Sequence, residues 1–326
     1  MGLTAEGLVH VDGLLSRWVQ LPTGVRAHYV TSGDDGPAVV LLHGGIIGSS
    51  GTAGWRLMAP FLGQHGFRVY CPDMPSFGLT EDAAQVYSPG PGGHVDFLHD
   101  FTTALGLDRF HLAGNSMGCM NTVNYTVAHP ERVVSFVLVA GPVGDTVPGE
   151  YLRWFNIQPN GRRPNTRRFD GTAESMRSML QAILHRPGEI DPDLVAMRTA
   201  AANRQREAYQ RHLAARDAVA TGDAPDLAAR LSTAGRLREL TIPGIYLYGR
   251  DDGFPVAELG HPQEDALARI QFFYPADCGH QGQTDQPELF NQVFLEFFST
   301  GKVSTATAER AGVSDRRPPN PALVGP

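Results

Sequence analysis

The pentapeptide Gly114-Asn115-Ser116-Met117-Gly118 is the feature that most constrains what this chain can fold into. It follows a predicted buried strand, Arg109–Gly114, and opens a predicted helix, Met117–Ala128. Its two glycines carry no Cβ, so the backbone can turn sharply around the serine. The serine hydroxyl is therefore expected to stand exposed at a helix N-terminus, where a backbone N–H and the helix dipole favour negative charge.

Short apolar runs bounded by Gly, Pro or Asp recur along the chain and predict strands of a mostly parallel, buried sheet. These runs are Ala38–His43, Phe67–Cys71, Arg109–Gly114, Val133–Ala140, Ile245–Gly249 and Ile270–Tyr274. Segments between them, such as Gly93–Leu105, are predicted to be amphipathic helices. The earlier stretches Ser16–Gln20 and Val25–Thr31 flank a turn and predict an antiparallel hairpin at the sheet edge. The alternation predicts the α/β class.

The strand pattern stops after Ala140, which suggests an insertion. Residues 145–240 are predicted to form a helical cap over the carboxyl ends of the strands, where open α/β sheets bind ligands. Its most periodic parts are Met176–His185 and Leu194–Ala220. Residues 1–144 and 241–300 are expected to form the core, which ends in a helix over Glu288–Phe298. The Pro-, Ala- and Thr-rich residues 301–326 predict a mostly disordered tail.

Composition and charge exclude several classes of protein. The net charge of −7 implies no basic face, which disfavours a role with nucleic acid. No apolar run approaches the roughly 20 residues of a membrane span, and no signal peptide pattern is present. The three cysteines, Cys71, Cys119 and Cys278, lie far apart and argue against disulfides or a zinc site. The sequence therefore predicts a cytoplasmic protein, without a metal or an organic cofactor, whose partner is a small-molecule substrate.

Two residues late in the chain complete a candidate catalytic set. A serine hydroxyl is a poor nucleophile until a base removes its proton, and a histidine base needs an acceptor on its other nitrogen. Asp252 follows a predicted strand ending at Gly249, and His280 follows the next predicted strand. The order Ser116, Asp252, His280 is the one expected for this type of fold. Asp251 and Asp145 remain alternatives for the acid.

The segment Leu41-Leu42-His43-Gly44-Gly45 follows an early strand, where a second donor to an oxyanion is expected. A backbone N–H from residues 44–46, with Gly45 favoured, would pair with the Met117 N–H to form an oxyanion hole. His43 is interpreted as structural, holding this loop by hydrogen bonds. A simple glycine-rich turn with a capping serine is disfavoured, because these further motifs occur in the required order.

From about Trp18 to Phe298 the chain resembles the α/β-hydrolase superfamily, and within it most resembles the meta-cleavage product hydrolases. The residues that carry the resemblance are His43-Gly44-Gly45, Gly114-Asn115-Ser116-Met117-Gly118, Tyr248-Gly249-Arg250-Asp251-Asp252 and Cys278-Gly279-His280. The resemblance implies an α/β-hydrolase fold and an enzyme of aromatic catabolism. It would cleave a carbon–carbon bond in 2-hydroxy-6-oxo-dienoates, which are formed by ring-opening of catechols. It also implies a homodimer or a larger homo-oligomer.

The resemblance also assigns substrate-binding residues. In that family Met or Leu follows the serine, as Met117 does here, and an arginine of the cap binds the substrate carboxylate, a position matched by Arg198. Gly44, Ile46, Asn115 and Gln281 are expected to line the substrate site.

Two departures from the family pattern alter the pocket beside the nucleophile. Gln281 stands where the family usually carries tryptophan, and Gly44-Gly45-Ile46-Ile47-Gly48 replaces its usual glycine-rich segment.

Two other functions remain open from the sequence. A carboxylesterase or lactonase needs the same triad and oxyanion hole, and the fold does not separate it from a carbon–carbon hydrolase. A ligand receptor built on a hydrolase scaffold, with the cap closing on a signal molecule, is the alternative outside enzymes.

Overall fold

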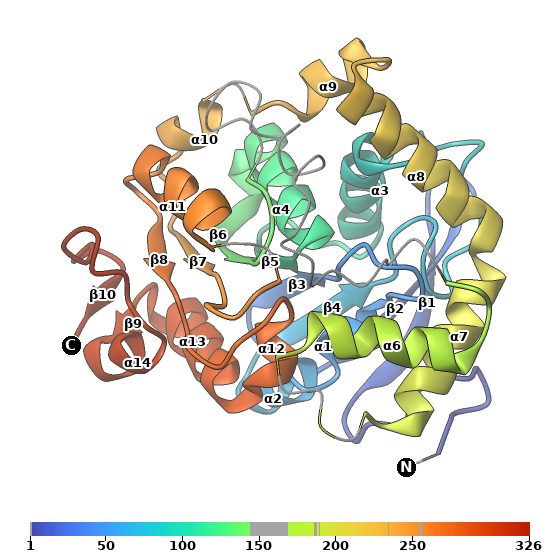
Figure 1. The fold of residues 1–326 in the computed structure, drawn as a ribbon, viewed down its shortest axis with the longest axis horizontal. Coiled ribbons are helices and arrows are strands. Elements are labelled where there is room, and N and C mark those ends of the chain that lie inside the picture. Colours follow the sequence, from blue (N-terminus) through green and yellow to red (C-terminus); the bar gives the residue numbers. More distant parts are fainter. Residues whose placement is uncertain (1, 144–168, 186–187, 189, 234, 254–255) are drawn as a thin grey trace.

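An eight-stranded sheet forms the centre of the molecule (Figure 1). The computed structural model describes residues 2–143, 169–185, 188, 190–233, 235–253 and 256–326. The strand order is β1-β2-β4-β3-β5-β6-β7-β8. The strands are β1 (Leu15–Gln20), β2 (Arg26–Ser32), β3 (Ala38–Leu42), β4 (Arg68–Pro72), β5 (Phe110–Asn115), β6 (Val133–Val139), β7 (Gly244–Leu247) and β8 (Gln271–Phe273).

Strand direction in the sheet follows the sequence prediction. β1 pairs antiparallel with β2, and β2 pairs antiparallel with β4. The pairs from β4 and β3 through to β8 are parallel. All residues of β3 and β5 are buried, as expected for apolar strands covered on both faces.

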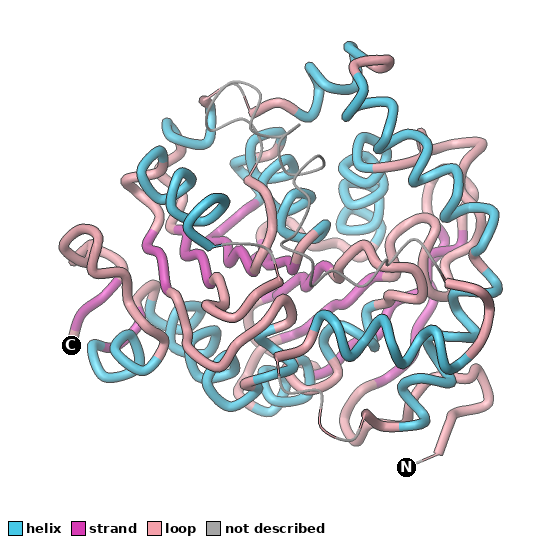
Figure 2. Tube along the Cα trace, viewed as in Figure 1, coloured by secondary structure: helices cyan, strands magenta, loops and turns pink. Residues whose placement is uncertain are grey.

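Helices cover both faces of this sheet (Figure 2). Figure 1 shows α3, α4 and α11 on one side and α2 and α13 on the other. The helices of the core are α1 (Gly51–Trp55), α2 (Ala59–Gln64), α3 (Pro91–Ala104), α4 (Met117–Ala128), the short 3₁₀ helix η1 (Pro130–Arg132), α11 (Val256–Ala266), α12 (Gly282–Asp285) and α13 (Pro287–Thr300). This arrangement is the α/β-hydrolase fold that the sequence predicts.

The described residues between β6 and β7 lie mostly in helices. It contains α6 (Ala173–Ile183), α7 (Pro192–Arg204), α8 (Arg206–Thr221), α9 (Pro225–Leu231) and α10 (Arg236–Glu239). The single periodic stretch Leu194–Ala220 is divided into α7 and α8 at Gln205. The amide of Gln205 donates to the carbonyls of Phe77, Gly78 and Thr80, so a contact with the core fixes this break. Residues 144–168, where the cap is predicted to begin, lie outside the described residues.

The prediction of a disordered tail over residues 301–326 is wrong. This segment forms β9 (Val303–Ser304), α14 (Thr305–Arg310) and β10 (Val324–Gly325). Its backbone continues the sheet, since the N–H of Tyr274 donates to Gly312 and the N–H of Ser314 donates to Phe272. A covered edge strand is protected from pairing with other chains. The composition predicted disorder because the stabilising partner, the edge of β8, is distant in sequence.

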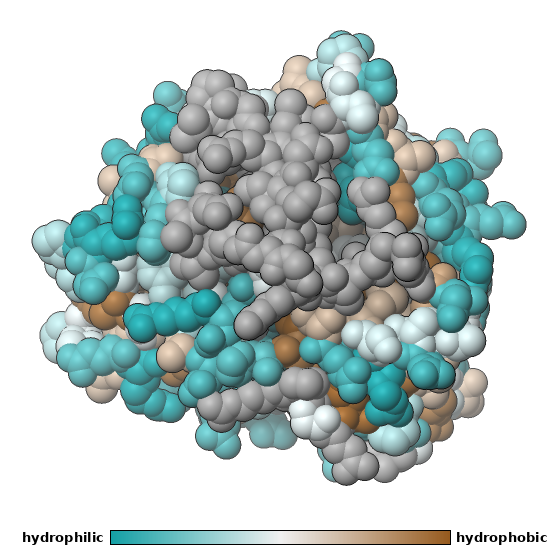
Figure 3. All heavy atoms as spheres, viewed as in Figure 1, coloured by the Kyte–Doolittle hydropathy of each residue, from teal (hydrophilic) through white to brown (hydrophobic). Residues whose placement is uncertain are grey.

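None of the described helices combines the length and apolar composition needed to cross a membrane. Described residues on the face in Figure 3 are mostly hydrophilic, and hydrophobic residues appear there in small separate patches. The three cysteines are unpaired and buried.

Candidate active site

Ser116 occupies the turn between β5 and α4 with a strained backbone. Its φ of 56° and ψ of −114° lie in a region that residues with a Cβ rarely adopt. Its N–H donates to the carbonyl of Val139 at 2.8 Å, which anchors the turn to β6. Such strain at the N-terminus of a helix is the signature of a nucleophile elbow.

Close backbone contacts explain the two glycines that flank Ser116. A Cβ on Gly114 would lie 2.1 Å from the carbonyl oxygen of Gly118. A Cβ on Gly118 would lie 2.2 Å from the carbonyl oxygen of Leu42. Any larger residue at either position would push the turn apart, so the glycines are required for the elbow to form.

Ser116, His280 and Asp252 form a continuous hydrogen-bonded set. The His280 Nε2 lies 2.8 Å from the Ser116 Oγ, and its Nδ1 lies 2.9 Å from the Asp252 Oδ2. The side chains of His280 and Asp252 are 6% and 0% exposed. In this arrangement the imidazole can accept the serine proton while the carboxylate holds its other nitrogen.

The neighbouring aspartates have different partners. The Asp251 Oδ2 accepts from the N–H of Cys278 at 3.4 Å and lies 3.9 Å from the His185 Nδ1. Of this adjacent pair, Asp252 is therefore the residue bonded to His280. Asp145, the remaining alternative, lies outside the described residues.

His43 orients the loop that carries the predicted oxyanion donor. The N–H of Met74 donates to the His43 Nε2 at 3.0 Å, so the ring proton resides on Nδ1, which donates to the carbonyl of Gly44 at 2.8 Å. Burial lowers the pKa of His43 and keeps the ring neutral. This geometry supports the structural interpretation of His43.

The two predicted oxyanion donors lie side by side. A Cβ on Gly45 would lie 2.9 Å from the Cβ of Met117, so the loop packs directly on the start of α4. The N–H of Met117 belongs to the first turn of that helix, where no N–H has a partner within the helix. Gly44 also approaches the elbow, since a Cβ there would lie 3.6 Å from the Ser116 Cβ.

Arg198 of α7 is buried without an acidic partner among the described residues. It is 1% exposed, its Nη2 donates to the Ser49 Oγ at 3.2 Å, and its Nε has no hydrogen-bond partner. Burial, together with the nearby guanidinium of Arg56, lowers the pKa of Arg198 to about 10. A buried cation is normally paired, so this geometry favours an anionic ligand.

The other predicted substrate-binding residues differ in their surroundings. The Asn115 Nδ2 donates to the carbonyl of His280 at 2.8 Å and to that of Val139 at 3.2 Å, so it holds the histidine loop. Gln281 is 5% exposed and is the N-cap of α12, while Ile46 is half-buried on the loop after Gly45. Substrate contact by these residues stays a prediction.

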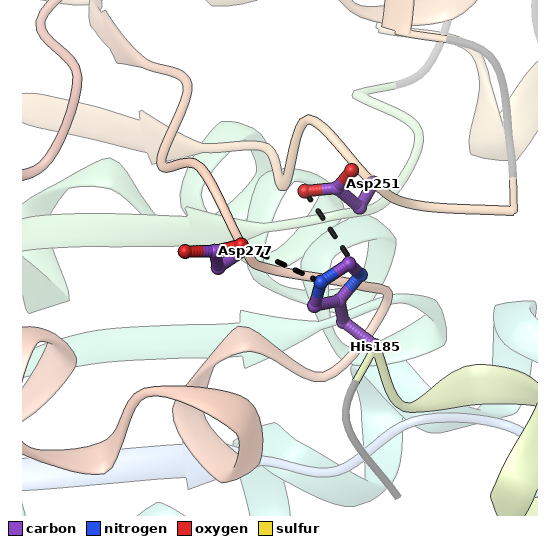
Figure 4. A group of neighbouring side chains, drawn as sticks. All are labelled: His185, Asp251 and Asp277. Carbon is purple, nitrogen blue, oxygen red and sulfur yellow. Dashed lines mark ion pairs between the residues drawn. The ribbon is translucent and has the colours of Figure 1, made fainter.

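One group beside the active site has the composition of a metal site. His185, Asp251 and Asp277 offer ligand atoms that lie within 4.8 Å of one another, and it is the group of this kind found among the described residues (Figure 4). The Asp251 carboxylate faces Nδ1 at 3.9 Å, however, and the Asp277 carboxylate faces Nε2 at 3.7 Å. The two carboxylates therefore face opposite nitrogens of the ring, whereas a metal ion takes only one of them.

Two residues of the site were missed by sequence reasoning. The hydroxyl of Tyr209, on α8, donates to the carbonyl of Gly45, and no local pattern announces a contact across 164 residues. The carboxylate of Asp285 accepts from the N–H of Gly279 and from that of His185. Asp285 could have been suspected, because it follows His280 closely on a turn that must be held.

A comparison with protein families decides the assignment. The model described as "Alpha/beta hydrolase family" matches residues 39–293. This chain belongs to the α/β-hydrolase family. The match contains every residue of the hydrogen-bonded Ser116–His280–Asp252 set, and the family accounts for the sheet, the elbow and the order of these residues.

Among curated relatives, this α/β-hydrolase is similar to enzymes named for dienoate cleavage. A 2-hydroxy-6-oxononadienedioate/2-hydroxy-6-oxononatrienedioate hydrolase of Paraburkholderia phymatum is 27% identical over 90% of this chain and 98% of its own length. A 2-hydroxy-6-oxo-6-phenylhexa-2,4-dienoate hydrolase of Burkholderia cepacia is 29% identical over 85% of this chain and 92% of its own.

Solved structures agree on the fold. A meta-cleavage product hydrolase from Pseudomonas fluorescens superposes with a TM-score of 0.68 at 24% identity, covering 87% of this chain and 98% of that one.

Proposed function

We propose that this α/β-hydrolase cleaves a carbon–carbon bond in 2-hydroxy-6-oxo-dienoates, the ring-cleavage products of catechols. The observation that carries the proposal is the buried Arg198, whose guanidinium has no acidic partner among the described residues. A dienoate brings a carboxylate that can satisfy this cation through charge-assisted hydrogen bonds. A neutral ester brings none. The names of the similar curated enzymes support the same substrate class.

The hydrogen-bonded set supplies the chemistry of the first step. After ketonisation of the dienol, which the pocket and His280 would promote, Ser116 attacks the ketone at C6. Its proton moves to the His280 Nε2, which lies 2.8 Å away, while Asp252 stabilises the imidazolium. The N–H groups of Met117 and Gly45 stabilise the oxyanion.

Collapse of the oxyanion breaks the carbon–carbon bond and leaves an acyl group on Ser116. The leaving fragment departs as a carbanion stabilised by its own conjugated carbonyl, and it takes up the proton held by His280. Water then loses a proton to His280 and attacks the acyl-serine, releasing a carboxylic acid and restoring Ser116. In sum, one water molecule is added across the broken bond.

The test compares an acidic and a neutral substrate in two arginine variants. We expect the wild type to bleach 2-hydroxy-6-oxo-6-phenylhexa-2,4-dienoate much faster than it hydrolyses p-nitrophenyl acetate. Arg198→Gln should lower kcat/KM for the dienoate by roughly 50- to 100-fold, the loss of one charge-assisted contact, and leave ester turnover nearly unchanged. Arg206→Gln, an exposed change on α8, is the matched control.

Each contrary outcome points to one of the alternatives. Dominant ester or lactone turnover, with equal losses on both substrates in Arg198→Gln, would indicate a carboxylesterase or lactonase. Tight binding of the dienoate without turnover would indicate a receptor. The predicted cytoplasmic location and the predicted homodimer or larger assembly stay predictions, and the reaction itself requires only a small-molecule substrate.

A further inference from the structure

The loop that carries Gly45 is bonded to the helical segment between β6 and β7. The hydroxyl of Tyr209, in α8, donates to the carbonyl oxygen of Gly45 at 3.1 Å. Tyr209 is 6% exposed, so this hydroxyl is largely shielded from water. Loop and helix are far apart in sequence, and their contact therefore depends on how α8 packs over the core.

Because a peptide group is planar, a hydrogen bond to its carbonyl also fixes the direction of its N–H. In a trans peptide the N–H points opposite to the preceding C=O, and no cis peptide occurs among the described residues. The bond from His43 to the Gly44 carbonyl therefore sets the direction of the Gly45 N–H. The bond from Tyr209 to the Gly45 carbonyl sets the direction of the Ile46 N–H in the same way.

Both peptide groups that flank the Gly45 Cα are thus held by hydrogen bonds from side chains. One bond comes from His43 in the core and the other from Tyr209 in α8. A glycine has unusually free φ and ψ angles, so without such bonds either peptide group can rotate. Rotation of the first peptide group would turn the Gly45 N–H away from the oxyanion, and movement of the second would shift the Gly45 backbone that carries this N–H, so either change would weaken an electrostatic contribution to the transition state.

Packing fixes the direction of the Tyr209 hydroxyl. Its ring meets the ring of Phe77 edge-on, with centroids 5.6 Å apart, and stacks on that of His212, with centroids 5.9 Å apart. The Phe77 ring also meets the ring of His43 at 5.1 Å. One phenyl ring therefore supports both side chains that orient the loop.

We propose that Tyr209 is a positioning residue whose hydrogen bond to Gly45 makes the oxyanion hole complete only when α8 is seated on the core. The proposal rests on the proposed function only in requiring that this loop stabilises an oxyanion, which applies to ester and dienoate substrates alike.

The kinetic test removes one hydroxyl. Tyr209→Phe keeps the ring and should lower kcat by about tenfold, the loss of one hydrogen bond, with KM nearly unchanged. The loss should appear with both p-nitrophenyl acetate and the dienoate, so a failure of the dienoate assignment does not hide it. Tyr87→Phe, which removes a hydroxyl bonded to Asp100, is the control and should keep wild-type kcat. An unchanged kcat, or a loss confined to KM, would overturn the proposal.

A spectroscopic test is independent of activity. The sequence contains two Gly-Ile pairs, Gly45–Ile46 and Gly244–Ile245. Protein labelled with carbonyl ¹³C in glycine and ¹⁵N in isoleucine therefore gives two correlated amide signals. Tyr209→Phe should move the Gly45–Ile46 signal and leave that of Gly244–Ile245, a pair at the start of β7, in place. Two unmoved signals would contradict the proposal, as would equal movement of both, which indicates a general change of structure.

Discussion

Two Ser–His–Asp arrays in the described part of the chain have nearly the same distances and different surroundings. In the active site, His280 links Ser116 at 2.8 Å to Asp252 at 2.9 Å. In the β1–β2 hairpin, His28 links Ser16 at 3.0 Å to Asp73 at 2.7 Å. Residue types and distances alone therefore do not distinguish the two arrays.

The hydrogen bonds around each serine separate the two arrays. The Ser16 hydroxyl donates its only proton to Glu6, so it can only accept from His28. Asp73 also accepts from the N–H groups of Gly51 and Leu79, which makes it a structural tie between segments.

Ser16 also lies within the edge strand β1, whereas Ser116 occupies a strained turn at the start of α4. A nucleophilic serine therefore requires a hydroxyl proton that can pass to the histidine, and oxyanion donors nearby, as well as the three residues of a triad.

Removing each serine should give the largest difference. Ser116→Ala should lower kcat by roughly 10⁵- to 10⁶-fold, because the attacking atom is lost. Ser16→Ala, the matched control, should keep wild-type kcat, because Ser16 has no part in the reaction. Steady-state rates with p-nitrophenyl acetate and the dienoate measure both. A large loss in Ser16→Ala, with activity retained in Ser116→Ala, would reverse the comparison.

The aspartates should follow the same division. Asp252→Asn should lower kcat by about 10⁴-fold, since an amide favours the wrong tautomer of His280. Asp251→Asn should stay near the wild-type kcat, because its carboxylate contacts Cys278 and His185 instead. If Asp252→Asn retains activity, the acid of the triad is another residue.

Asp73→Asn should change stability rather than the chemical step. Burial raises the pKa of Asp73, but His28, His43 and the N–H of Leu79 together more than offset this, and the carboxylate remains ionised with a lowered pKa. Removing its charge leaves buried donors poorly satisfied and should lower the free energy of unfolding by roughly 3 to 5 kcal/mol. Urea titration measures this change, while kcat per folded molecule should remain. Wild-type stability would show that the second array does not hold the hairpin.

Acidification should reveal further histidines that are structural. Burial lowers the pKa of His94 to about 4, and it does the same for His111. Below about pH 6.5 these two histidines bind protons in the unfolded chain but stay neutral in the folded chain. The free energy of unfolding therefore falls as the pH drops towards 4. Each histidine contributes on the order of 3 kcal/mol to this fall.

Thermal melting from pH 8 to pH 4 measures the effect, and His111→Gln should show a shallower decline than the wild type. A melting temperature that stays constant over this range would contradict the assignment of neutral buried histidines.

The smallest expected effect is on stability in Ser16→Ala. Its hydroxyl joins Glu6 to His28 at a partly exposed position, and a single hydrogen bond of this kind contributes about 1 kcal/mol. Chemical denaturation should therefore show a decrease near that size, clearly below that of Asp73→Asn. An equal loss in the two variants would mean that the serine, rather than the aspartate, dominates the array.

The sequence predicted the strands and α4 well, because their bounds depend mainly on residues that are neighbours in the chain. The strands appear within two residues of their predicted ends, and α4 has the predicted bounds, because apolar runs and flanking glycines mark them. The set Ser116, Asp252 and His280 was predictable because each residue follows a strand, in a fixed order.

Features that depend on distant contacts were not predictable in this way. The break at Gln205 depends on core carbonyls, and the order of the tail depends on the edge of β8. The bond from Tyr209 to Gly45 joins elements whose packing no local pattern encodes.

The most direct test of the account is the product balance of dienoate hydrolysis. Wild-type protein incubated with 2-hydroxy-6-oxo-6-phenylhexa-2,4-dienoate should release benzoate and 2-hydroxypenta-2,4-dienoate in equal amounts as the colour is lost, and Ser116→Ala should release neither at a comparable rate. Loss of colour without benzoate, or equal benzoate release by Ser116→Ala, would contradict carbon–carbon hydrolysis by this serine.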